Sequence, residues 1–192
     1  MAWLGTTPTV SRANSRDRAC RGKRPNARAW QHGRELLEAA IAQGSNHAFE
    51  TTLGARTIPA LLEQAAASHD VVMLFCGLDS PELHIERVRM RVLHGGHDIP
   101  EGKIRERWTA SRLNLIKLMP HLASLQVFDN SAGAQAGQEI PDPVPVLEIM
   151  DGEMSFPDPD DGRALASTPA WARPIVQAAI ELHTSPRQET PS

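Results

Sequence analysis

Residues 71–82, VVMLFCGLDSPE, decide the fold class of this chain of 192 residues. The apolar run from Val71 to Cys76 is typical of a strand buried on both faces of a sheet, with Cys76 as a small buried residue. Ser80 and Pro81 follow as a helix-start pattern, with Ser80 at the N-cap and Pro81 in the first helical position. A buried strand that leads directly into a helix predicts an α/β fold with a parallel sheet.

The segments on either side extend this alternation. Residues 145–156 predict a β-hairpin that turns at Asp151-Gly152, a dipeptide that suits tight hairpin turns. We therefore expect a parallel sheet with flanking helices, followed by a C-terminal hairpin and helix. The expected helices cover residues 27–43, 58–68, 80–93, 101–119 and 171–183, and the expected strands cover residues 47–52, 71–76 and 125–129.

Composition narrows the class of protein. The net charge is −3, with 41% hydrophobic and 22% charged residues, which is ordinary for a soluble domain. No apolar run has the length of a membrane span or a signal peptide, so we expect a cytoplasmic protein with no membrane partner. Cys20 and Cys76 form neither a disulfide framework nor a zinc pattern.

Charge is unevenly distributed. Residues 1–34 contain eight basic side chains and one acidic side chain, a local charge of +7. Residues 1–26 also lack an apolar period, so we expect them to be disordered or non-native. A basic arm that binds nucleic acid has the same composition and remains an alternative, although the total charge disfavours nucleic acid as a partner.

Polar residues follow three expected strands, at Glu50-Thr51-Thr52, Asp79-Ser80 and Asp129-Asn130-Ser131. In a parallel α/β sheet, ligands bind beyond the carboxyl ends of the strands. The three segments are therefore candidates for one site. Loops are polar in any protein, so the ordinary alternative is a set of solvated strand ends.

Arg87 and Arg91 are four residues apart and share one face of an expected helix. Two guanidinium groups on one face suit an anion, because each planar fork can donate paired hydrogen bonds to phosphate oxygens. The alternative is a solvated basic face that pairs with Glu82 and Glu86.

The loop from His94 to Pro100 joins two expected helices. Gly95-Gly96 followed by Ile99-Pro100 is typical of a hinged loop, and a loop of this kind between helices can act as a lid. Its His and Asp side chains do not have the spacing of a metal-ligand set, so we expect no metal site.

Five blocks of sequence together resemble the zeta-toxin family, and are most similar to the bacterial branch described as UDP-N-acetylglucosamine kinases. The resemblance covers about residues 30–156. It implies a P-loop kinase fold that uses ATP and Mg²⁺ to phosphorylate a hydroxyl of a small substrate, a sugar nucleotide of the UDP-sugar class, with an antitoxin protein as a partner. The blocks are FETTL at 49–53, LDSPEL at 78–83, RVRMRV at 87–92, GGHDIP at 95–100 and DNS at 129–131.

The resemblance also implies roles for individual residues. By motif position, the acceptor substrate would contact Glu50, Thr51 and Thr52. The catalytic residues that clamp the phosphates would be Arg87 and Arg91, and the lid would contain His97 and Asp98. The nucleotide cofactor side would contain Asp129 and Asn130.

The chain departs from this family at its N-terminus. The family's first strand leads into G-x-x-x-x-G-K-[ST], which holds the ATP phosphates and Mg²⁺. Here only Lys23 follows a glycine, and Arg24 stands where Ser or Thr is required. We expect the first strand and the phosphate loop to be missing from a truncated kinase; the alternative is a non-catalytic remnant that binds a sugar nucleotide or a protein.

Three segments follow from this pattern. Residues 1–26 are the basic segment, residues 27–156 are the kinase-like core with its lid, and residues 157–192 are a C-terminal loop, helix and tail.

Overall fold

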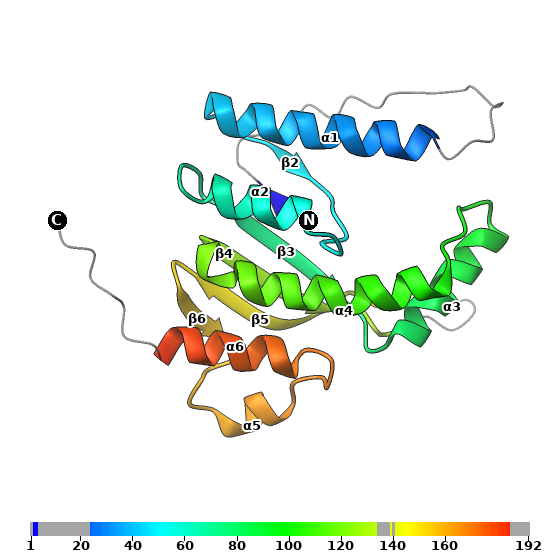
Figure 1. The fold of residues 1–192 in the computed structure, drawn as a ribbon. Helices are drawn as coiled ribbons and strands as arrows, with labels where there is room; N and C mark the ends of the chain where they lie inside the picture. Colours follow the sequence, from blue (N-terminus) through cyan, green and yellow to red (C-terminus); the bar gives the residue numbers. More distant parts are fainter. Residues whose placement is uncertain (1, 4–23, 134–138, 140, 185–192) are drawn as a thin grey trace.

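The structure, a computed structural model, describes residues 2–3, 24–133, 139 and 141–184. Most of the expected basic segment and the final tail therefore lie outside the described residues. The fold is mixed α/β, with one sheet in the strand order β2-β1-β3-β4-β5-β6 and helices packed against it, which confirms the expected class (Figure 1). The strands are β1 Ala2–Trp3, β2 Ala48–Phe49, β3 Val72–Gly77, β4 Ser124–Asp129, β5 Val144–Met150 and β6 Glu153–Phe156. The helices are α1 Arg24–Gln43, α2 Thr57–Ala65, α3 Pro81–Leu93, α4 Glu101–Leu118, a 3₁₀ turn at Met119–His121, α5 Gly162–Ala166 and α6 Arg173–Thr184.

The sheet is mixed rather than parallel throughout. β3 and β4 are parallel and paired along their whole length, from Val72 with Ser124 to Gly77 with Asp129. β5 is antiparallel to β4, and β6 returns antiparallel to β5 as the expected hairpin. Asp151 and Gly152 have positive φ angles of 51° and 76°, the backbone conformation that favours this dipeptide in a tight turn.

The strand β1 lies in the segment of residues 1–26, which the sequence pattern predicts to be disordered or non-native. Ala2–Trp3 pairs antiparallel with Ala48–Phe49 on one side and with Val72–Met73 on the other. The expectation of disorder is therefore wrong for these two residues. Since β1 is antiparallel to both neighbours, β2 and β3 run parallel to each other. A two-residue strand depends on the edges beside it, so its own sequence carries no detectable period.

Four helices form a layer on one face of the sheet. α1 contacts α2, α2 contacts α4, and α4 contacts α6 (Figure 1). Most apolar strand side chains facing this layer are fully buried, although Phe75 is only partly buried. Each fully buried side chain contributes roughly 1.5–3 kcal/mol through the hydrophobic effect. The main core joins these strand residues to the helices through Met73, Leu125, Val127, Leu147, Ile149, Leu37, Leu62, Leu115 and Ile175.

The opposite face of the central strands is not buried. By the pairing register, this face carries alternate residues of two strands, Val72, Leu74 and Cys76 from β3 and Ser124, Gln126 and Phe128 from β4. None of the six is buried, and Cys76 is exposed. The expectation of a strand buried on both faces, with a buried Cys76, is therefore wrong. An apolar strand sequence cannot say how many helices cover its sheet.

The helical hairpin α3–α4 projects beyond the carboxyl ends of β3 and β4 (Figure 1). We call its outer part, residues 81–107, the arm. Ile85, Val88 and Ile104 form a small core inside the arm, separate from the main core. Ser80 Oγ accepts a hydrogen bond from Leu83 N at 3.2 Å, so the predicted N-cap is confirmed.

The end of α3 is built by the predicted Gly-Gly pair. Gly95 has a φ of 87°, and its N–H donates to Val92 O at 3.0 Å, while Gly96 N–H donates to Arg91 O at 2.9 Å. This pair of bonds is the Schellman arrangement that ends a helix. The two glycines therefore fix the start of the 94–100 loop.

Candidate anion-binding site

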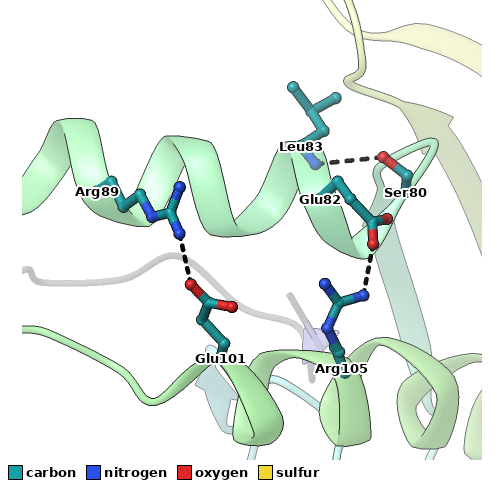
Figure 2. Close-up of polar contacts among 6 residues, drawn as sticks. All are labelled: Ser80, Glu82, Leu83, Arg89, Glu101 and Arg105. Carbon is teal, nitrogen blue, oxygen red and sulfur yellow. Dashed lines mark hydrogen bonds and ion pairs between the residues drawn. The ribbon is translucent and has the colours of Figure 1, made fainter.

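Two ion pairs join α3 to α4 across the arm. Arg89 pairs with Glu101, and Arg105 pairs with Glu82 (Figure 2). The hydrogen bond from Arg105 lowers the pKa of Glu82 below its usual value. Glu82 is therefore already engaged by a helix α4 residue, and the alternative in which it neutralises Arg87 or Arg91 does not hold.

Three other arginines of the arm are not paired with carboxylates in the described part of the chain. Among the residues that the structure describes, Arg87, Arg91 and Arg107 form no ion pair with a carboxylate. Arg87 Nη2 donates to Ala132 O at 3.0 Å, and Arg91 Nη2 donates to His97 O at 3.4 Å. Because each guanidinium has five donors, both retain hydrogen-bonding capacity for an anion.

Arg91 and Arg107 line one open pocket at the arm, with a volume of about 520 Å³. Its wall contains three cationic side chains and one carboxylate, Asp98. Lys103, the third cation, pairs with Glu106 at 2.6 Å, which lowers the pKa of Glu106. The pocket is therefore positively charged, and it is lined by Arg91, Gly96, His97, Asp98, Ile99, Pro100, Lys103 and Arg107.

The loop after β2 lies against the same helix that carries Arg107. A Cβ atom added to Gly54 would lie 2.8 Å from Arg107 Cγ, so the two residues are in close contact. Glu50 and Thr52 are exposed, and Thr51 Oγ1 accepts a hydrogen bond from Leu53 N at 3.1 Å. Gly54, two residues after the predicted substrate segment, thus contacts a residue of the pocket, whereas Glu50, Thr51 and Thr52 are not part of the pocket wall.

The ends of β3 and β4 are joined by a polar network. Asp129 Oδ1 accepts hydrogen bonds from Ser131 N and Oγ and from Trp171 Nε1. Ser131 Oγ also accepts from Asp79 N at 2.7 Å, and Asn130 N donates to Gly77 O at 3.0 Å. Ser131 Oγ and the backbone of Asn130 therefore join the strand ends, and one oxygen of the predicted cofactor residue Asp129 holds Ser131 in place. The bond from Arg87 to Ala132 brings the predicted clamp to the same loop.

The structure brings some predicted residues together and leaves others apart. Arg91, His97 and Asp98 share the pocket, whereas Arg87 lies beside the loop that follows Asp129 and Asn130. The sequence pattern did not single out Arg107. Its four-residue spacing from Lys103 was the available signal, but the contact with Gly54 spans more than fifty residues of chain.

Two other classes of feature are absent from the described residues. They contain no group of three or more His, Cys, Asp or Glu side chains that could hold a metal ion. They also contain no helix with the length and hydropathy needed to cross a membrane.

Comparisons with known proteins found no relative of this chain. No family model, no curated protein and no solved structure matches it.

Proposed function

We propose that the pocket of the arm binds the pyrophosphate of a sugar nucleotide. The observation that carries this proposal is the placement of Arg91 and Arg107, two guanidiniums without an ion pair in the described part of the chain, on the wall of one pocket. A doubly negative pyrophosphate matches their charge and their planar donor geometry. Asp98 and the backbone of the 96–100 loop would provide contacts to the neutral sugar hydroxyls.

The resemblance to zeta-toxin-like kinases supports the same ligand class. It implies that Arg87 and Arg91 contact phosphate and that Glu50, Thr51 and Thr52 contact the acceptor. The contact between Arg107 and Gly54 supports a shared location for these two groups, because it ties the acceptor loop to the pocket wall. In this proposal the chain is the acceptor-binding part of a kinase of that type.

Phosphoryl transfer by this chain alone is not part of the proposal. Such transfer depends on holding the ATP phosphates and Mg²⁺ in line with the acceptor hydroxyl. The sequence has no G-x-x-x-x-G-K-[ST] for that purpose. We therefore expect neither measurable affinity for ATP·Mg²⁺ at micromolar concentrations nor transfer of its γ-phosphate to a bound sugar nucleotide.

Isothermal titration calorimetry tests the proposal directly. UDP-N-acetylglucosamine, UDP-glucose, inorganic pyrophosphate and ATP·Mg²⁺ are titrated separately into the full chain at low salt. We expect heat from both UDP-sugars and from pyrophosphate. A chain that gives no heat with either UDP-sugar or with pyrophosphate at millimolar concentration does not have the proposed site.

Matched arginine variants locate the binding. Arg91→Gln and Arg107→Gln each remove a charge from the pocket, and a charge-assisted hydrogen bond is worth about 1.5–3 kcal/mol, or roughly tenfold to a hundredfold in Kd. Arg89→Gln removes the same charge from the same arm, but Arg89 pairs with Glu101 and does not line the pocket. It should change Kd by less than about threefold, through long-range charge alone. Equal losses in all three variants would indicate non-specific attraction.

A further inference from the structure

His84 lies beside the arginines that the proposed ligand would contact. It is half-buried on α3, three residues before Arg87 and seven before Arg91, so the three side chains share one face of the helix. Arg107 of α4 is the third charge acting on it, and it lines the pocket with Arg91. Three guanidiniums from two helices thus act electrostatically on the imidazole.

Two acidic side chains of the arm are engaged by partners other than His84. From α3 itself, Glu82 pairs with Arg105, and from α4, Glu101 pairs with Arg89 (Figure 2). The loop after β4 reaches α3 through a neutral carbonyl, Ala132 O, which accepts from Arg87. The charges that lower the pKa of His84 are those of Arg91, Arg87 and Arg107. Glu86 of α3 and Asp98 of the pocket wall are the carboxylates of the arm with no ion pair in the described part of the chain.

We propose that binding of a phosphorylated ligand at this pocket places a proton on His84, so that the ligand binds more tightly as the pH falls. The inference rests on the proposed function of the pocket. It adds a residue, His84, that acts through Arg91 and Arg107 and is not part of the pocket wall. His84 therefore does not contact the ligand; it changes the charge beside the arginines that do.

The direction follows from the charges. In the free protein, burial and then the charges of Arg91, Arg87 and Arg107 hold the pKa of His84 below its ordinary value of 6.5, so the ring is neutral at neutral pH. An anion held by Arg91 and Arg107 offsets their charge and raises the pKa of His84. At pH values between the free and bound pKa, binding takes up a proton and affinity increases by at most about tenfold per pH unit. Below the free pKa, the ring is charged in both states and the affinity levels off.

Two measurements on the full chain test this linkage. Calorimetric titration with UDP-N-acetylglucosamine near pH 6, in buffers with different ionisation enthalpies and without phosphate, gives the number of protons taken up. Proton NMR of the histidine rings, with and without ligand, gives the change in pKa of each ring. We expect net proton uptake on binding. We also expect the ligand to raise the pKa of one histidine ring, and the NMR signal of that ring should be absent from the spectrum of His84→Gln.

Variants separate His84 from its neighbour in the pocket. His84→Gln should still bind the sugar nucleotide but should lose most of the proton uptake and of the pH dependence of Kd. His97→Gln removes an imidazole that lines the pocket, and it should retain the uptake. Uptake that persists in His84→Gln and disappears in His97→Gln would overturn the inference and assign the proton to His97.

The outcomes distinguish the two proposals. If neither the sugar nucleotide nor pyrophosphate binds, both the pocket function and the His84 linkage are wrong. If the ligand binds with a Kd that does not change with pH and without proton uptake, the linkage is wrong and the pocket function stands. If wild type takes up a proton and His84→Gln does not, both are supported.

Discussion

The side-chain nitrogen Nδ2 of Asn114 lies 2.7 Å from the carbonyl oxygen of Leu53 and donates a hydrogen bond to it. The same nitrogen also donates to Ala55 O at 3.1 Å. Asn114 is on α4, two helical turns after Arg107, so one helix holds the loop after β2 at one end and contacts it through Arg107 at the other. Leu53 has a φ of 51°, a conformation that a leucine adopts only where its surroundings require it.

Replacing Asn114 tests whether these bonds hold the loop. Asn114→Ala removes the donor from the partly buried carbonyl of Leu53 and from the exposed carbonyl of Ala55, and we expect the free energy of unfolding to fall by about 1–3 kcal/mol. Urea denaturation followed by circular dichroism measures the change. Asn114→Asp is the sharper comparison, because it keeps the shape but places a carboxylate against two carbonyl oxygens. It should be at least as destabilising as alanine; a stable aspartate variant would mean that the bonds contribute little.

Gly95 and Gly102 form a matched pair for the end of α3. Both have open space around the position of an added Cβ, but only Gly95 has a positive φ. Gly95→Ala should therefore destabilise the protein by about 1 kcal/mol, through backbone strain alone. Gly102→Ala lies within the first turn of α4 and should stabilise it by roughly 0.5–1 kcal/mol, because alanine has the higher helix propensity. The opposite signs are read from urea midpoints; two changes of the same sign would contradict the Schellman cap.

Local chemistry made α3 predictable, whereas the sheet around it depended on distant parts of the chain. Ser80 with Pro81, and Gly95 with Gly96, define the two ends of α3 within a few residues of sequence, and both ends were predicted. The strand pairing of Ala2–Trp3 depends instead on edges that lie more than forty residues away, and it was not predicted. Short-range patterns cannot report such pairing.

The candidate site shows the same division. Arg87 and Arg91 were identified because their spacing places them on one helix face. The arginine of α4 that completes the pocket, Arg107, was missed because its importance comes from Gly54 and from the way α4 folds back on α3. Thr51 was predicted to contact a substrate, but its hydroxyl accepts a local hydrogen bond from Leu53 N. A residue type suited to binding is often suited to a turn as well.

His84 also gives a prediction for the stability of the protein without ligand. Its pKa is lowered in the folded state by burial first and by the arginine charges second. Below pH 6.5, the unfolded chain therefore binds more protons at this position than the folded chain, and the free energy of unfolding should fall as the pH falls. Urea midpoints measured between pH 7.5 and pH 5.5 should decrease for the wild type. The decrease should be smaller for His84→Gln; parallel curves for the two proteins would exclude a contribution from His84.

The uncovered face of the sheet leads to a prediction about Cys76. This thiol is exposed and lies on the face that carries Val72, Leu74 and Phe128, none of which is buried. In a variant in which Cys20 is replaced by serine, a disulfide reagent should modify Cys76 in the native protein at a rate close to that of a free thiol in a short peptide. A face covered by another segment or by a second copy of the chain would protect it, since access limits thiol reactivity. Modification only after addition of urea would therefore show that this face is buried. The background rate comes from a double variant in which both Cys20 and Cys76 are replaced by serine.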